Sequence, residues 1–120
     1  MQRTAADGGI IISCDFCGTD WDQILPMIEG HHGSVICLDC LKRVLAQASS
    51  GDARFRCVMC LREQLPAEML RWRPTKVQEH ANPQATICGD CARQAAVAFS
   101  KDKDVDWTWD RKLGKGAQDA

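Results

Sequence analysis

Eight cysteines dominate this 120-residue chain, and all of them fall into Cys-x-x-Cys pairs. The pairs are Cys14/Cys17, Cys37/Cys40, Cys57/Cys60 and Cys88/Cys91. Two thiolates at this spacing bind one metal ion from a tight turn, and two such pairs complete a tetrahedral four-sulfur site. The sequence therefore predicts two bound metal ions, and zinc is the metal that this ligand set favours.

The four pairs combine most simply within each half of the chain. The predicted ligand sets are then Cys14, Cys17, Cys37 and Cys40 in the first half, and Cys57, Cys60, Cys88 and Cys91 in the second. The gap between pairs is 19 residues in the first half and 27 in the second, and the shorter gap fits four-cysteine zinc sites more closely. A cross-brace that joins the first and third pairs, rubredoxin-like iron sites, disulfides and a ligand from His31 or His32 are weaker alternatives.

Large apolar side chains are scarce, because 14 alanines and 8 cysteines make up much of the 45% hydrophobic content. Ordering each residue costs about 1–2 kcal/mol, whereas structural zinc contributes on the order of 10–16 kcal/mol. We therefore expect a small α+β fold that is stabilised by metal. The first residues do not show the charged start and apolar run of a secretory signal, and no apolar run approaches about 20 residues, so we expect a cytoplasmic protein without a secretory signal or a membrane span.

The two halves repeat one another. Residues 36–40, Ile-Cys-Leu-Asp-Cys, recur as Ile-Cys-Gly-Asp-Cys at 87–91. After each pair, apolar residues follow the i, i+3, i+4, i+7 pattern of a short helix, over 41–48 and 92–99. Asp39 and Asp90 are predicted to cap these helices, and Gly51 to follow the end of the first.

The segments between the pairs predict β-hairpins. Residues 24–30 and 34–36 flank a turn at 31–33, while 69–72 and 86–87 flank a longer loop. Knuckle, hairpin and helix in this order are typical of a treble-clef zinc finger, so we expect two treble clefs in tandem. The predicted organisation is an N-terminal arm 1–13, finger one 14–50, a linker 51–56, finger two 57–100, and a tryptophan-containing tail 101–120.

The first half resembles the four-cysteine zinc finger of the ClpX unfoldase. The residues that carry the resemblance are Cys14-Asp15-Phe16-Cys17-Gly18, Met27-Ile28-Glu29-Gly30 and Val35-Ile36-Cys37-Leu38-Asp39-Cys40-Leu41. The second half resembles a diverged copy of this finger. It keeps the cysteine pair at the helix start, but Leu61 replaces the knuckle glycine and the gap between its pairs is longer. In that family the finger is a docking and dimerisation module for adaptors and substrates, and a separate ATPase does the work. This chain contains no Gly-x-x-x-x-Gly-Lys-[Ser/Thr] motif.

We therefore expect no enzymatic activity and a function in protein–protein recognition, as an adaptor, inhibitor or assembly factor. The resemblance to ClpX implies a link to a chaperone or protease machine. Two other classes compete with it. Phe55 and Trp72 among the arginines of 54–76 are typical of single-strand nucleic-acid binding, although the formal charge is −1. Zinc-bound thiolates also suit a redox sensor.

Charge separates the two fingers. Residues 13–41 carry acidic side chains and no Lys or Arg, whereas 54–76 are rich in arginine. The opposite charges predict that the fingers pack as an intramolecular pseudo-dimer, with a homodimer as the alternative.

The tail has a period-two pattern in which Val105, Trp107 and Trp109 alternate with polar residues, as in one strand. This strand either folds back on its own finger or docks on a partner. The candidate partner-binding residues are Trp107, Trp109, Arg71, Trp72 and Arg73, and a disordered end is expected from Gly114 onward.

Overall fold

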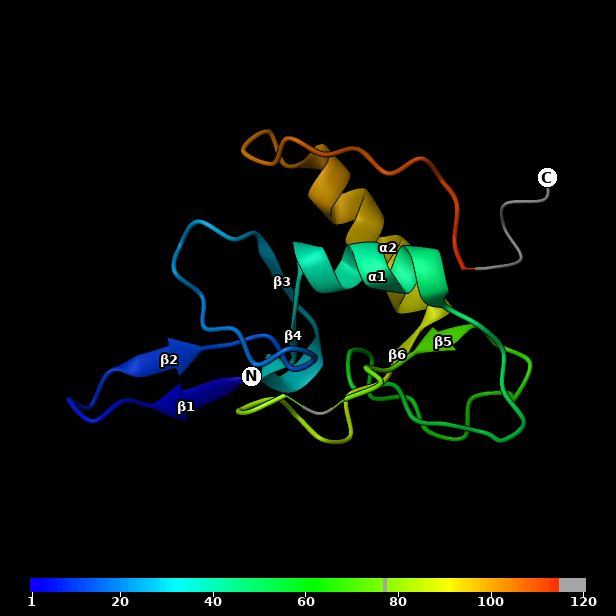
Figure 1. Cartoon of the computed structure of the whole chain (residues 1–120), viewed down its shortest axis with the longest axis horizontal. Helices are drawn as coiled ribbons and strands as arrows, with labels where there is room; N and C mark the ends of the chain where they lie inside the picture. The colour runs from blue at the N-terminus through cyan, green and yellow to red at the C-terminus, as the bar shows by residue number, and fades with distance from the viewer. Residues whose placement is uncertain (77, 115–120) are drawn as a thin grey trace.

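A computed structural model describes residues 1–76 and 78–114, apart from the side chain of His32. The chain is a small α+β protein with two helices and three short hairpins; the helices pack against the second and third hairpins, and the first hairpin extends to one side (Figure 1). Its elements are β1 Gln2–Thr4, β2 Ile10–Ile12, β3 Met27–Glu29, a 3₁₀ turn His31–Gly33, β4 Val35–Cys37, α1 Leu38–Gln47, β5 Arg71–Trp72, β6 Ile87–Cys88 and α2 Gly89–Lys101.

Each half contains the predicted hairpin and runs from it directly into a helix. β3 pairs antiparallel with β4, with Ile28 opposite Ile36, and β5 pairs with β6, with Trp72 opposite Ile87. The last strand residue in each half, Cys37 or Cys88, immediately precedes the helix. The second cysteine pair of each half is therefore placed at a strand-to-helix junction.

The predicted helix ends need two corrections. The residues at the N-caps are Cys37 and Cys88, and Asp39 and Asp90 lie two residues further on, in the first turn of each helix. The sulfur of Cys37 itself accepts the Cys40 N–H at 3.4 Å. The first helix also ends at Gln47, before Gly51, because Ser49 leaves it to form a bridge with Arg71.

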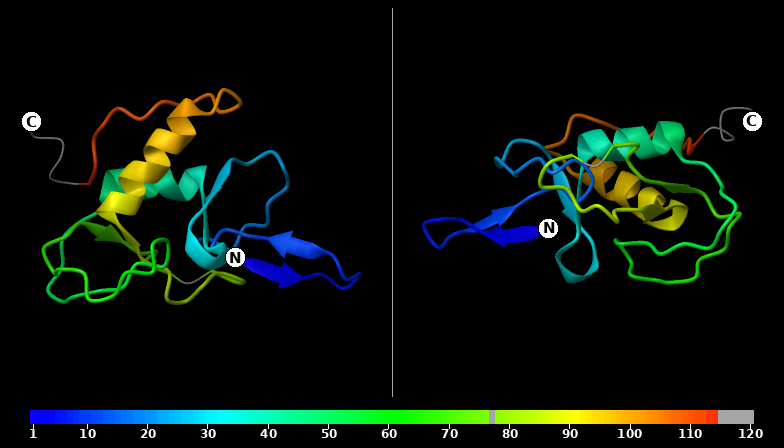
Figure 2. Two further views of the ribbon diagram at one scale, coloured as in Figure 1. Left: turned by 180° about the vertical axis from the view of Figure 1, so that it is seen from behind. Right: turned by 60° about the horizontal axis from the view of Figure 1, so that its bottom comes forward.

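One hydrophobic core spans both halves. α1 and α2 cross and pack against each other (Figure 2). Buried side chains from the first half, such as Phe16, Leu41 and Val44, belong to the same cluster as Trp72, Ile87 and Phe99 from the second. Among the described residues, the ion pairs between side chains all lie within one half. Apolar burial and hydrogen bonds of both the backbone and side chains join the halves, rather than the predicted attraction of charge.

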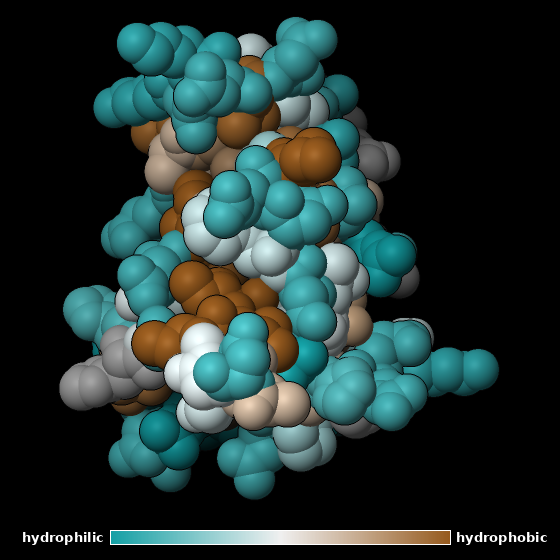
Figure 3. All heavy atoms as spheres, turned by 90° about the vertical axis from the view of Figure 1, so that its left-hand side faces the viewer, coloured by the Kyte–Doolittle hydropathy of each residue, from teal (hydrophilic) through white to brown (hydrophobic). Residues whose placement is uncertain are grey.

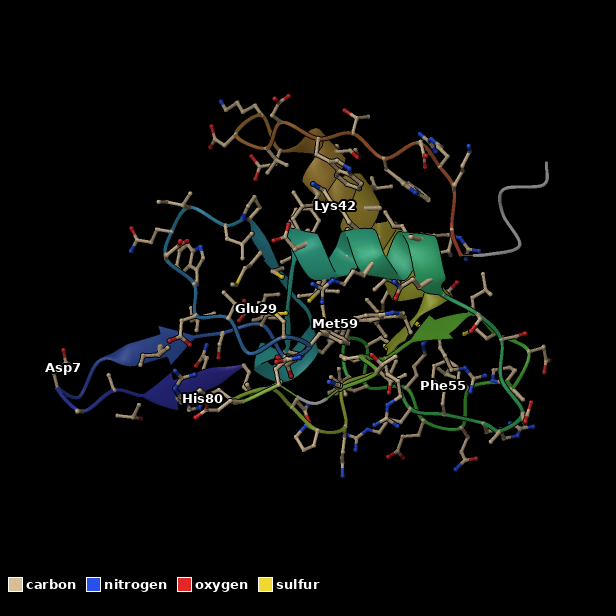
Figure 4. The ribbon with its side chains drawn as sticks, in the orientation of Figure 1. Asp7, Glu29, Lys42, Phe55, Met59 and His80 are labelled. Carbon is tan, nitrogen blue, oxygen red and sulfur yellow. The ribbon has the colours of Figure 1, made fainter. Side chains whose placement is uncertain are left out.

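The N-terminal arm is a β-ribbon that the sequence did not predict. β1 and β2 form an antiparallel hairpin, and residues 19–21 extend it through a Ser13–Asp20 bridge and a 2.7 Å bond from Trp21 N–H to the Ile12 carbonyl. We call residues 1–13 and 19–21 the N-terminal ribbon. It projects from the body of the molecule, with Asp7 at its tip (Figure 4).

The tail folds back over the helices but is not a strand. Residues 105–109 have no regular secondary structure. Their alternate apolar side chains, Val105, Trp107 and Trp109, pack against the core. The Trp109 N–H donates to Ser100 Oγ at 2.8 Å, and the Gly114 N–H donates to the Leu45 carbonyl at 2.6 Å. Gly114 is thus held in place, and the rest of the end predicted to be disordered lies outside the described residues. None of the described helices has the length and apolar character that a bilayer span requires.

Candidate functional site

The eight cysteines gather into two clusters, one in each half. One contains Cys14, Cys17, Cys37 and Cys40, and the other contains Cys57, Cys60, Cys88 and Cys91. Within each cluster the sulfur atoms lie within 4.8 Å of one another. The predicted pairing within halves is confirmed, and the cross-brace alternative is wrong.

The spacing of the sulfurs fits zinc. The Sγ atoms of Cys14 and Cys40, of Cys17 and Cys37, and of Cys57 and Cys91 are each 3.8 Å apart. Four sulfurs at the usual Zn–S distance of about 2.3 Å lie about 3.8 Å from one another on the edges of a tetrahedron. A disulfide would need about 2.05 Å, and all eight cysteines are free. The chain therefore has two zinc sites, and the disulfide alternative is wrong.

Two backbone contacts recur in both clusters. In the knuckle of the first half, the Phe16 N–H and the Cys37 N–H each lie 3.4 Å from Cys14 Sγ. In the second half, Met59 N–H and Cys88 N–H contact Cys57 Sγ at the same distance. These N–H groups stabilise thiolate charge and aim each sulfur at its cluster.

The thiols of a cluster cannot all ionise unless a cation joins them. Hydrogen bonds from Cys14, Cys37 and Cys40 hold the pKa of Cys17 far below its ordinary value, and the same kind of contact raises the pKa of Cys40. In the second cluster, Cys88 raises the pKa of Cys57 to about 11. Protons lost by one thiol are thus retained by its neighbours, and zinc replaces them when it binds.

The clusters differ in their polar neighbours. In the first, Cys17 Sγ lies 3.2 Å from the Thr19 hydroxyl. In the second, the Arg62 guanidinium lies 3.2 Å from Cys60 Sγ, and the sulfurs and Asp90 raise the pKa of Arg62.

The coordination of each site is complete, although some of its cysteines reach the surface. Four sulfurs fill a tetrahedral zinc ion, so no ligand position is open to a reactive water. Cys17, Cys60 and Cys91 are half-buried, and Cys60 and Cys91 line a cavity of about 400 Å³ beside Met59 and Ala95. His31 is exposed and lies outside both clusters, while the side chain of His32 is outside the described part of the chain.

The candidate partner-binding residues lie in different environments. Trp107 and Trp109 pack half-buried against their own helices. Trp72 is only 8% exposed, and its indole N–H donates to Gln47 Oε1 at 2.9 Å. Of these five residues, only Arg73 is exposed. The structure thus brings Trp72 into the core rather than onto a surface.

Arg71 is used inside the molecule. Its guanidinium donates to the carbonyl oxygens of Ala53, at 2.7 Å, and Ala67, and it stacks 4.0 Å from the centroid of Phe55. Figure 4 shows Phe55 in the long loop that precedes β5. Arg71 therefore organises residues 53–69, a segment without helix or strand.

Sequence reasoning missed the surface that carries the most exposed apolar side chains. Among the described residues, the exposed large apolar residues are Ile10, Trp21 and Ile24, at 71%, 45% and 84% exposure. All three belong to the N-terminal ribbon or follow it directly. Figure 3 views the side from which the ribbon projects, and apolar surface is visible there between hydrophilic side chains. The signal available was the Ile10-Ile11-Ile12 run in a chain poor in large apolar residues.

Comparisons with protein-family models, curated proteins and solved structures find no match to this chain. The likeness to a ClpX-type finger therefore depends on the residues themselves.

Proposed function

We propose that the chain is a tandem treble-clef zinc protein that acts as a protein–protein interaction module and has no enzymatic activity of its own. The observation that carries this proposal is the exposure of Ile10, Trp21 and Ile24, which lie in the N-terminal ribbon or in the loop after it. Exposed apolar groups that gather in one region mark interaction surfaces. The closed four-sulfur sites support a structural role for zinc.

The repeated backbone contacts support the treble-clef interpretation of both halves. Gly18 N–H donates to the Cys14 carbonyl, and Leu61 N–H donates to the Cys57 carbonyl, both at 2.9 Å. Leu61, which departs from the ClpX-type pattern, has a φ of 63°, close to the 76° of Gly18. The second knuckle therefore has the same backbone turn without the glycine, which favours a diverged copy of a ClpX-like finger.

The N-terminal ribbon has one apolar face. Successive residues of a strand point to opposite sides, so Ile10 and Ile12 share a face. Trp21 lies beside Ile12, and Ile24 follows in the next loop. On the other face, Arg3 forms an ion pair with Asp20 at 2.8 Å. The ribbon thus presents aliphatic and aromatic groups to a partner, and Trp is a common anchor in interfaces.

The surroundings of this face are acidic. Residues 4–41 contain no Lys or Arg, and Asp7, Asp22 and Glu29 are all exposed. Complementary charge speeds association and selects partners. We therefore propose a partner whose contact surface combines apolar and basic side chains.

The nucleic-acid alternative loses part of its support. Two of the arginines that motivated it, Arg62 and Arg71, bind thiols and backbone carbonyls, and Arg56 lies near Glu63. Trp72 is buried and cannot stack on a base. Salt-dependent binding of random single strands would favour this alternative.

The test is an affinity purification from the native cell with matched surface variants. We expect the wild-type chain to retain a specific protein, and the double variant Ile10→Ser/Ile24→Ser to lose it while still binding two zinc ions. The control Glu68→Ser/Lys103→Ser changes two exposed polar residues elsewhere and should retain the partner. Equal recovery by all three proteins would rule out the ribbon as the recognition surface.

A further inference from the structure

Arg62 contacts two ligands of the second cluster at once. Its Nε lies 3.2 Å from Cys60 Sγ, and its Nη2 lies 3.5 Å from Cys88 Sγ. The same Nη2 donates to Asp90 Oδ2 at 3.2 Å. One guanidinium therefore joins the knuckle pair, the strand-to-helix pair and the first turn of α2.

No cationic side chain among the described residues contacts a sulfur of the first cluster. Its described contacts are with its own thiols, backbone N–H groups and the Thr19 hydroxyl. Four thiolates around zinc carry net negative charge, and among the described contacts only the second cluster receives hydrogen bonds from a charged donor. The two zinc sites therefore differ in how their negative charge is compensated.

We propose that Arg62 is a positioning residue for the second zinc site, which fixes two ligand sulfurs and compensates their charge so that zinc leaves this site slowly. Partners of this kind typically change metal affinity by about 10–100-fold when they are removed. Slow release matters here because the half-buried Cys60 and Cys91 line a cavity of about 400 Å³, which a competing chelator can enter.

Arg93 provides a matched control. Its Nη1 donates to Asp90 Oδ1 at 3.3 Å, so Arg93→Gln removes one cationic partner of Asp90 and leaves the described contacts to sulfur in place. Arg62→Lys retains the charge but loses the planar fork that reaches two sulfurs.

The test uses the full chain with two readouts. With cadmium-113 in both sites, we expect Arg62→Gln to shift one of the two NMR signals and to accelerate zinc transfer from one site to a colorimetric chelator by about 10–100-fold. Arg62→Lys should restore part of both effects, and Arg93→Gln should behave as wild type. Unchanged signals and rates in Arg62→Gln, or equal effects of Arg62→Gln and Arg93→Gln, would overturn the proposal. If Arg62→Gln does not fold, Arg62→Lys decides: an unshifted second-site signal then overturns it.

Discussion

The ring of Phe16 lies against the ring of Trp72, with centroids 5.9 Å apart and planes tilted by 38°. Phe16 stands inside the knuckle of the first zinc site, and Trp72 is in β5 of the second half. The rings are 1% and 8% exposed. This contact makes the two metal-binding halves parts of one core.

We expect Phe16→Ala to destabilise the whole chain by about 3–5 kcal/mol, because it removes a buried aromatic ring. Denaturant unfolding of the zinc-loaded protein, followed by circular dichroism, measures the change. A double-mutant cycle with Trp72→Leu should give a coupling energy of about 0.5–1.5 kcal/mol. Trp21→Ala, at an exposed site, is the control and should cost less than about 1 kcal/mol. Independent unfolding of the two halves would contradict the shared core.

Gly18→Ala should be more damaging than Gly33→Ala. Both glycines have a left-handed backbone, with φ of +76° and +82°, which costs a residue with a Cβ about 1–2 kcal/mol. At Gly18 the added Cβ would also overlap the Glu79 carbonyl oxygen and lie 2.9 Å from Ala81 N, whereas at Gly33 nothing lies within 4 Å. The difference in unfolding free energy between the variants therefore measures the close contact between the two halves at Gly18. Equal losses of unfolding free energy in the two variants would disprove this contact.

Arg71→Lys should destabilise the chain by about 2 kcal/mol, since a lysine cannot donate to several carbonyls and stack on Phe55 at the same time. The neighbouring Arg73→Lys is the control, because Arg73 is exposed and makes one described bond, to the Pro83 carbonyl at 3.2 Å. Thermal unfolding and proteolysis within residues 53–69 measure the effect. Resistance of Arg71→Lys to both would show that the loop is held by other contacts.

Zinc binding should strengthen as the pH rises. Without metal, raised pKa values keep Cys57, Cys40 and Cys91 protonated at neutral pH, with that of Cys57 at about 11. Zinc displaces these protons, so the apparent dissociation constant should fall about tenfold per pH unit for each proton displaced. Acid should therefore release zinc and unfold the chain.

Competition with a chelator at several pH values, together with elemental analysis, measures this dependence and the two zinc ions per chain. A chain that stays folded after chelation would contradict the predicted role of zinc in folding. A zinc affinity independent of pH would contradict the predicted displacement of protons.

Several local features were predictable from residues close together in the chain. The Cys-x-x-Cys spacing predicted the ligands, and the repeated Ile-Cys-x-Asp-Cys segment predicted two strand-to-helix junctions. The helix caps were not predictable from propensity. Asp39 and Asp90 are good capping residues, but the N-caps are Cys37 and Cys88, which also belong to the metal-binding clusters. The ribbon was missed because its short strands are stabilised by pairing with each other and with residues 19–21.

The side of the molecule on which a residue lies depends on contacts between distant segments. Arg71, Trp72 and the tail tryptophans have the chemistry of an interface, yet the first two serve the interior and the tail packs on its own helices. Asp15 is similar: its carboxylate accepts the Val35 N–H at 2.9 Å and the Asn82 side-chain amide at 3.3 Å, which ties the first knuckle to a loop of the second half.

The amino-acid sequence by itself determined the metal ligands and the hairpin-to-helix unit of each half, because thiol spacing and apolar periodicity act over a few residues. Only the tertiary structure decided that the halves share one core, that Arg62 serves the second site alone, and that Ile10, Trp21 and Ile24 remain exposed. Burial and charge compensation depend on which distant groups come into contact. The two halves have similar local sequence patterns, so these patterns do not show which contacts form between distant residues.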